Sequence, residues 1–207
     1  MAVTKYSSVY LAGFRATGKT TIGKAVALKL GWDFVDMDKE IQQNSAATIN
    51  ELTKGGEDWR KFRALEQELL KKIIGKKKIV VAMGGGTTVN DVPANINESF
   101  GAQNWKLLRK AGALVILLTA NEKIIADRMR AHEMRAPHTV RPPLKSVEGA
   151  PAARSRTGKK DLVEAIIKDS IKTFREREKA YLAQTSHIID TGKTTKQEAV
   201  KRILSLL

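Results

Sequence analysis

The sequence contains no cysteine, which excludes disulfide bonds and thiolate chemistry and is typical of a reducing compartment. It also has no long apolar run: the N-terminal stretch MAVTKYSSVYLAG resembles neither a secretory signal nor a membrane span. We therefore expect a cytoplasmic protein without membrane contacts. The three histidines, His132, His138 and His187, lack the spacing of metal ligands, so no zinc site is expected.

Aromatic residues and acidic residues are both scarce. Aromatic residues make up 5% of the chain, and 37 lysines and arginines against 22 acidic residues give a formal net charge of +15. This charge favours anionic ligands, which include nucleotides, acidic metabolites and nucleic acid, but a heavily solvated surface explains it equally well. Since no aromatic residues interleave with the basic ones, a nucleic-acid partner is not expected.

Apolar patterning predicts a single α/β domain over residues 1–207. Strands that alternate with helices indicate a parallel sheet with helices on both faces, and ligands bind such sheets at the carboxyl ends of the strands. The expected strands span 9–12, 32–37, 79–83, 114–118 and 187–190, and the expected helices begin near residues 19, 48, 58, 121, 161 and 195.

Residues 131–160 interrupt this pattern and contain all but one of the prolines. A segment of this length without periodicity is typical of a mobile lid or a disordered insert. Within it, Arg141 precedes Pro142 and Pro143. On closure Arg141 could neutralise charge on a transferring phosphoryl group; the alternative is a mobile basic loop.

The stretch GFRATGKT, which begins at Gly13, matches the phosphate-loop pattern between an expected strand and an expected helix. Lys19 would contact the β- and γ-phosphates, Thr20 would bind Mg²⁺, and the helix N-terminus would add positive potential. These features predict a nucleoside triphosphate as phosphoryl donor. The expected nucleotide-binding residues are Gly13, Ala16, Thr17, Gly18, Lys19, Thr20 and Thr21.

Asp36 and Asp38 lie two residues apart at the end of an expected strand, FVDMD. In extended chain their carboxylates would point the same way, so that one could hold Mg²⁺ through water and the other could accept a hydroxyl proton. The alternative is a helix-capping aspartate followed by a surface aspartate.

Two arginines and a run of glycines complete the candidate residues. Arg63 adjoins apolar positions of its helix, either to meet an anionic ligand or only to pair with Glu66. Arg177 shares a helix face with Phe174 and Tyr181. Gly84–Gly86 after a strand favours either a flat ligand against bare backbone or a flexible turn.

Together, GFRATGKT, FVDMD, FRALE, GGG, VRPPL and REKAY resemble the shikimate kinase family, in the order of its motifs and over nearly the whole chain. The resemblance implies a P-loop kinase of the nucleoside-monophosphate-kinase type, a three-layer sandwich around a five-stranded parallel sheet. It also implies transfer of the ATP γ-phosphate to the 3-hydroxyl of shikimate, in the shikimate pathway of aromatic amino-acid biosynthesis.

The resemblance also assigns roles to residues. Lys19 would contact phosphates, and Thr20 and Asp36 would bind Mg²⁺. Asp38 would bind a shikimate hydroxyl as base or orienter, Arg63 and Arg177 would grip the carboxylate, Gly84, Gly85 and Gly86 would line the ring, and Arg141 would be the lid arginine. Ala16 stands where the family commonly has glycine, and Arg128, Arg130 and Arg135 compete for the adenine contact.

Two other interpretations stay open. A related small-metabolite kinase, such as a gluconate kinase, would share the phosphate loop and the lid without FRALE, GGG and REKAY together. A basic P-loop protein that binds nucleic acid would show strongly salt-dependent binding. The main hypothesis, a monomeric shikimate kinase, requires Arg63 and Arg177 to meet across the triglycine beside Asp38.

Overall fold

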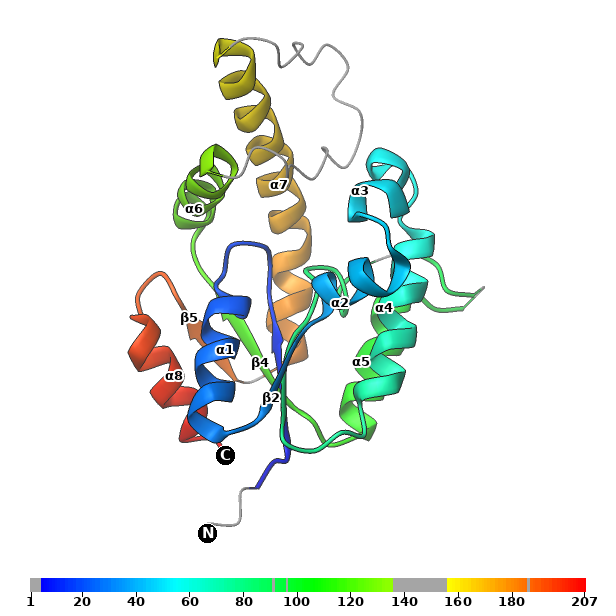
Figure 1. Ribbon diagram of the computed structural model, residues 1–207, viewed down its shortest axis with the longest axis vertical. Coiled ribbons are helices and arrows are strands. Elements are labelled where there is room, and N and C mark those ends of the chain that lie inside the picture. The colour runs from blue at the N-terminus through cyan, green and yellow to red at the C-terminus, as the bar shows by residue number, and fades with distance from the viewer. Residues whose placement is uncertain (1–4, 91, 96, 136–155, 186) are drawn as a thin grey trace.

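Strands and helices alternate along the chain (Figure 1). The computed structural model describes residues 5–90, 92–95, 97–135, 156–185 and 187–207. The elements in chain order are β1 (Ser8–Ala12), α1 (Lys19–Leu30), β2 (Asp33–Asp36), α2 (Met37–Ser45), α3 (Ile49–Leu52), η1 (Lys54–Gly56), α4 (Arg60–Ile73), β3 (Ile79–Ala82), α5 (Phe100–Lys110), β4 (Leu114–Thr119), α6 (Glu122–Arg135), α7 (Arg156–Gln184), β5 (Ile188–Asp190) and α8 (Lys196–Leu204).

The five strands form one parallel sheet in the order β2-β3-β1-β4-β5, which confirms the expected fold class. Tyr10 in the central strand lies opposite Val81 on one side and Val115 on the other. Tyr10 and its neighbour Leu11 face opposite hydrophobic clusters, so the sheet is buried on both faces. This burial explains why the strands read as continuous apolar runs.

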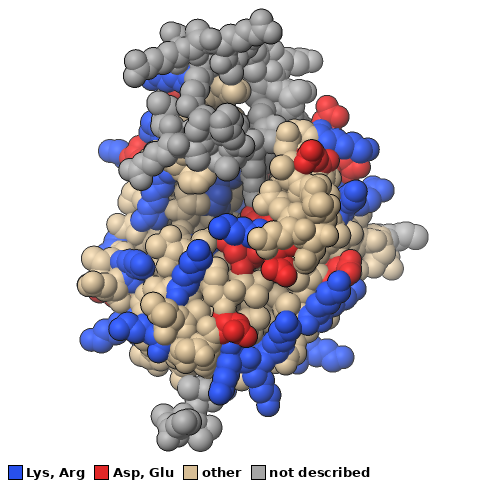
Figure 2. Space-filling model, viewed as in Figure 1, with Lys and Arg blue, Asp and Glu red and all other residues tan. Residues whose placement is uncertain are grey.

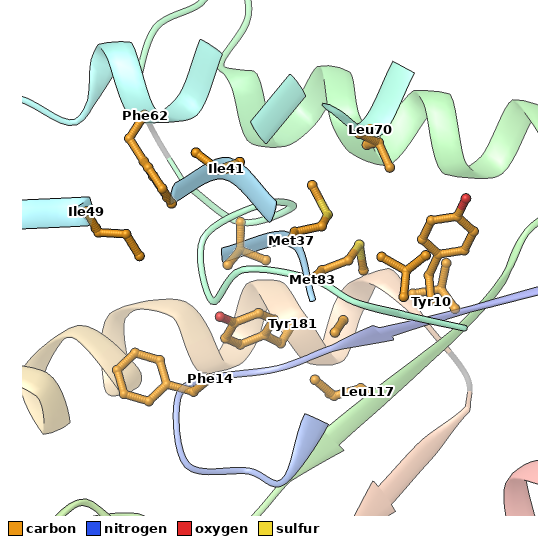
Figure 3. Packing of buried hydrophobic residues seen from close by; sticks show 14 of the residues in the cluster. Tyr10, Phe14, Met37, Ile41, Ile49, Phe62, Leu70, Met83, Leu117 and Tyr181 are labelled. Carbon is orange, nitrogen blue, oxygen red and sulfur yellow. The ribbon is translucent and has the colours of Figure 1, made fainter. Parts of the chain in front are cut away.

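Helices cover the two faces in separate layers. Residues of α1 and α8, including Val26 and Ile203, pack on one face. Residues of α4, α5 and α7 pack on the other, where Figure 3 shows Tyr181 close to Phe14 and the sheet. Among the described residues, no helix combines the length and apolar character needed to cross a bilayer.

Several elements differ from the sequence prediction. The second strand ends at Asp36 because Asp36 caps a helix that was not expected, α2, and accepts a hydrogen bond from the Lys39 amide. Helix α5, also not expected, begins after the capping residue Ser99. Helices α6 and α7 extend into both ends of the 131–160 insert, and residues 136–155 lie outside the described residues.

Candidate active site

The phosphate loop joins β1 to α1 with its glycines in left-handed backbone conformations. Gly13 has φ 133° and passes so close to the Leu118 carbonyl that a Cβ would overlap it. Gly18 has φ 93° and caps α1. The Lys19 ammonium donates to the carbonyl oxygens of Gly13 at 2.8 Å and Phe14 at 2.7 Å. The loop therefore curves around its own lysine at the N-terminus of α1, where an anion binds favourably.

Thr20 and Asp36 come together from the start of α1 and the end of β2. The Thr20 hydroxyl donates to Asp36 Oδ2 at 2.7 Å. A hydroxyl and a carboxylate oxygen at this spacing fit Mg²⁺, which takes few protein ligands and completes its octahedron with phosphate oxygens and water. The described part of the chain has no cluster of three or more His, Cys, Asp or Glu residues suited to a metal. A Mg²⁺ ion at Thr20 and Asp36 would need further ligands, which phosphate oxygens and water can supply.

A cavity of about 760 Å³ opens above the phosphate loop, large enough for a nucleotide. Of the expected nucleotide-binding residues, Ala16, Gly18, Lys19, Thr20 and Thr21 line it. Gly13 and Thr17 do not line it: Thr17 is buried behind the loop, where its hydroxyl donates to the Phe14 carbonyl at 2.8 Å. These two residues hold the shape of the loop.

Arg128 stands apart from the other arginines proposed for the adenine contact. It lines the nucleotide cavity and donates to the carbonyl oxygens of Ala16 and Thr191. Arg130 instead binds Glu164 across the α6–α7 pair, and the side chain of Arg135 lies outside the described residues. The structure thus places one of the two described candidates, Arg128, at the cavity.

Asp38 lies in the first turn of α2, so the expectation that it continues an extended strand with Asp36 is wrong. Asp36 caps the helix, as the alternative interpretation had it, but Asp38 is not a surface residue. It lines both the nucleotide cavity and a second, smaller cavity. A helical turn therefore delivers its carboxylate to the same edge of the sheet as Asp36.

The second cavity is where the two distant arginines meet. Arg63 from α4 and Arg177 from α7 line it together with Asp38, Gly85 and Gly86; the other lining residues are Phe14, Arg15, Trp59, Phe62 and Thr173. We call it the acceptor cavity. Its volume of about 20 Å³ holds roughly one water molecule.

Arg63 and Glu66 form a buried ion pair in the wall of this cavity. The side chain of Arg63 is 4% exposed and that of Glu66 is 0% exposed. Thr87 donates its hydroxyl proton to the other oxygen of Glu66 at 2.6 Å, and the Arg63 guanidinium lies 4.8 Å from the centre of the Trp59 ring. Among the described residues, Arg63 Nε has no hydrogen-bond partner. Arg63 thus pairs with Glu66 and also faces the acceptor cavity.

Two glycines of Gly84–Gly86 leave room for the ion pair between Arg63 and Glu66. A Cβ at Gly84 would overlap Glu66, and one at Gly86 would overlap the Arg63 guanidinium. Gly85, which lines the cavity with Gly86, would place a Cβ 3.7 Å from the Arg15 amide nitrogen, an ordinary contact. Gly84 does not line the cavity. The sequence suggested either a ligand surface or a flexible turn for these glycines. Neither interpretation included the close approach of Gly84 to Glu66 and of Gly86 to Arg63.

Helix α7 holds the triglycine from the opposite side. Tyr181 donates its hydroxyl proton to the Gly85 carbonyl, and Arg177 Nη1 donates to the same oxygen at 3.3 Å. One turn later, Gln184 donates to the Thr88 carbonyl at 2.6 Å. Burial raises the pKa of Tyr181 to about 12, which keeps its hydroxyl protonated as a donor.

Known proteins of similar sequence identify the family of this chain. A family model described as shikimate kinase matches residues 15–207. The chain belongs to the shikimate kinase family. The shikimate kinase of Thermodesulfovibrio yellowstonii is 31% identical over 95% of this chain and 92% of its own length. That of Nitratidesulfovibrio vulgaris is 32% identical over 87% and 85%.

Solved shikimate kinases share the fold. The structure from Bacteroides thetaiotaomicron has a TM-score of 0.68 at 22% identity and covers 97% of both chains. The structure from Acinetobacter baumannii, which is in complex with shikimate, has a TM-score of 0.66 at 24% identity and covers 98% of this chain and 93% of its own. They support the P-loop kinase architecture of this family member.

Several residues around the two cavities of this shikimate kinase family member were not predicted from the sequence. Thr87 and Arg15 carried no signal, because neither a lone threonine nor a loop arginine indicates a partner. The role of Tyr181 as a donor to Gly85 was not foreseen, although its helix face was. Arg141, the expected lid arginine, lies outside the described residues.

Proposed function

We propose that this member of the shikimate kinase family transfers the γ-phosphoryl group of ATP to the 3-hydroxyl of shikimate through the residues that surround its two cavities. The observation that carries the proposal is the meeting of Arg63 and Arg177 in one small cavity with Asp38, which also borders the nucleotide cavity. Two guanidinium forks suit a carboxylate, and an aspartate suits a hydroxyl.

On the donor side, Lys19 leaves its carbonyl partners to contact the β- and γ-phosphates, and the α1 N-terminus faces the same charge. Thr20 and Asp36 would hold Mg²⁺ together with phosphate oxygens, and the bound ion would supply neutralisation of the phosphate charge. Arg128 contacts the adenine end of the nucleotide; its place in the cavity wall supports this role.

On the acceptor side, Arg63 and Arg177 bind the carboxylate of shikimate. Gly85 and Gly86 lie against the ring. Asp38 accepts the proton of the 3-hydroxyl as its oxygen attacks the γ-phosphorus, and ADP leaves with the electrons of the broken bond.

A coupled ADP-release assay tests the reaction. Shikimate, gluconate and nucleoside monophosphates are offered as rival acceptors at equal concentration. Saturable, Mg²⁺-dependent ADP release with shikimate alone supports the proposal, and preference for gluconate or a nucleotide would contradict it. Gel filtration of the same sample tests the proposed monomer.

Asp38→Asn tests the role of the aspartate. The amide keeps the size of the side chain but cannot accept the proton, so kcat should fall by about 10²- to 10⁴-fold. The affinity for ATP, measured by calorimetry, should change little. A variant with wild-type kcat would remove Asp38 from the reaction.

A further inference from the structure

Two residues belong to the walls of both cavities. Of the described residues that line the nucleotide cavity or the acceptor cavity, Arg15 and Asp38 line both. If the nucleotide occupies one cavity and the acceptor the other, the γ-phosphorus and the attacking oxygen meet between these two side chains. Asp38 already has a role there, in proton transfer. Arg15 adds a positive charge opposite the negative charge of Asp38, between the two cavities.

The local structure holds Arg15 in this position. It is half-buried within the phosphate loop, whose backbone β1 and α1 fix at either end. Its guanidinium lies 5.8 Å from the centre of the Phe14 ring. That ring is buried and packs 5.5 Å from the ring of Phe174 on α7. An arginine held beside an anchored ring loses little freedom when it binds an anion.

Three further cations each line one of the two cavities. Arg63 is neutralised by buried Glu66, Lys19 is bound to the carbonyls of the phosphate loop, and Arg177 donates to the Gly85 carbonyl. In the proposed reaction, Lys19 turns to the β- and γ-phosphates and the other two bind the carboxylate. Arg15, which lines both cavities, lies where charge passes from the γ-oxygens to the leaving oxygen in this reaction.

We propose that Arg15 is a further catalytic residue whose guanidinium contacts the transferring phosphoryl group and stabilises its transition state. This inference rests on the proposed function. The bond from the acceptor oxygen to phosphorus forms, the bond to the β–γ bridging oxygen breaks, and the proton passes to Asp38. Arg15 stays charged throughout and supplies only hydrogen bonds, which strengthen as negative charge moves onto the leaving oxygen.

The test compares Arg15→Gln and Arg15→Lys with Lys24→Gln, which removes one exposed positive charge from α1 away from both cavities. Steady-state kinetics give kcat and both KM values. Calorimetry then measures the affinity for ADP alone and for ADP with aluminium fluoride and shikimate, a mimic of the transferring phosphoryl group. Circular dichroism checks that each variant is folded.

Arg15→Gln should lower kcat by about 10²- to 10³-fold, the loss typical of one transition-state hydrogen-bond donor. Affinity for the aluminium fluoride complex should fall in parallel, while affinity for ADP alone and the KM for shikimate stay near wild type. Arg15→Lys should recover part of kcat, and Lys24→Gln should match wild type.

Two results would overturn the proposed role of Arg15 and leave the proposed function standing. One is an unchanged kcat in Arg15→Gln. The other is a rise in the KM for shikimate at constant kcat, which would make Arg15 a ligand of the carboxylate. If the wild-type protein instead releases no ADP with shikimate, the proposed function fails, and the role of Arg15 fails with it.

Discussion

Arg63 and Glu66 are two opposite charges removed from water almost completely. Such a pair is stable only where its remaining oxygens and protons also find partners, because desolvation otherwise exceeds the Coulombic gain. Thr87 supplies one of these partners through its hydroxyl. The Thr87 carbonyl is in turn held at 2.8 Å by the amide of buried Asn104. Thr87 therefore fixes the carboxylate that orients the proposed carboxylate-binding arginine.

Thr87→Val keeps the shape of this side chain and removes its donor. A lost hydrogen bond to a charged group costs about 1.5–3 kcal/mol, so urea denaturation should show a fall of that size in the free energy of unfolding. The KM for shikimate should rise, because Glu66 no longer holds Arg63 in place. The KM for ATP should stay constant.

Thr87→Ser should restore both values, since serine keeps the hydroxyl. Thr88→Val is a matched control: Thr88 is equally buried, and the described residues offer its hydroxyl no hydrogen bond. A Thr87→Val protein as stable as wild type, with an unchanged KM for shikimate, would contradict the importance of this contact.

Ala16 is a second residue whose role becomes visible only in the structure. It has φ 61°, a left-handed conformation at the position where the family commonly has glycine. An L-residue in this conformation carries about 1–2 kcal/mol of strain. The phosphate loop therefore tolerates a side chain here at an energetic cost.

Ala16→Gly should leave the free energy of unfolding unchanged or raise it by up to about 1 kcal/mol, because relief of strain offsets the entropy that glycine adds to the unfolded chain. Ala25→Gly, within helix α1, should lower it by about 1 kcal/mol. Thermal denaturation of both variants measures the difference. An equal loss in the two would show that Ala16 is unstrained.

At the scale of elements, sequence prediction succeeded where local chemistry decides. Helix α1 spans the expected residues between Gly18 and Gly31, and capping boxes at Thr48 and Thr195 begin α3 and α8 as expected. Helix α2 was missed because FVDMD was read as extended chain. The sequence does contain a helix signal here: Asp36 is a residue type that caps helices, and the apolar residues Met37 and Ile41 follow one turn apart.

Contacts between distant elements were beyond prediction from one sequence. Tyr181 of α7 meets Gly85 across 96 residues, and no local pattern specifies which carbonyl a tyrosine will reach. The FRALE and REKAY motifs predicted that Arg63 and Arg177 share a site, and both line the acceptor cavity. The pairing of Arg63 with Glu66 was one of the two expected interpretations and is confirmed. The contact of Glu66 with Thr87 and that of Arg177 with the Gly85 carbonyl depend on how α4 and α7 pack around the loop after β3.

The buried tyrosines of β1 and α7 make the elements sensitive to alkaline pH. Burial raises the pKa of both Tyr10 and Tyr181 to about 12, from a usual value of 10.0. Because the folded-state pKa lies above that of the unfolded chain, their contribution to stability is fully present below pH 10 and is lost as the pH rises toward 12.

The free energy of unfolding, measured by urea denaturation at steps from pH 9 to 12, should therefore decline over this range. Tyr181→Phe should flatten the decline, since it removes one of the titrating groups. At neutral pH the same variant should be less stable, because the Gly85 carbonyl loses a donor. An identical pH profile in wild type and variant would show that Tyr181 titrates normally.

At the scale of the whole molecule, the parallel sheet explains why the site residues converge. Gly13 and Gly84 follow β1 and β3, and Asp36 ends β2; the carboxyl ends of these parallel strands lie at one edge. The net charge of +15 is not confined to this edge, since Figure 2 shows lysines and arginines spread around the visible face. The positive charge at the two cavities comes from lining residues, which include Arg15, Arg63, Arg128 and Arg177.

The most direct test of the account is calorimetric titration of shikimate into Arg63→Lys, Arg177→Ala and the double variant. Arg63→Lys keeps a charge beside Glu66 but loses the guanidinium fork. Arg175→Ala is the control, because Arg175 lies on the same helix but pairs with Glu122 at the surface.

If Arg63 and Arg177 hold one carboxylate, each single variant should weaken shikimate binding by roughly tenfold or more, about 1.4 kcal/mol. The double variant should lose less than the sum of the two, as expected for groups that share a partner, and the control should bind like wild type. Wild-type affinity in either single variant, or strictly additive losses, would show that the two arginines do not grip the same group.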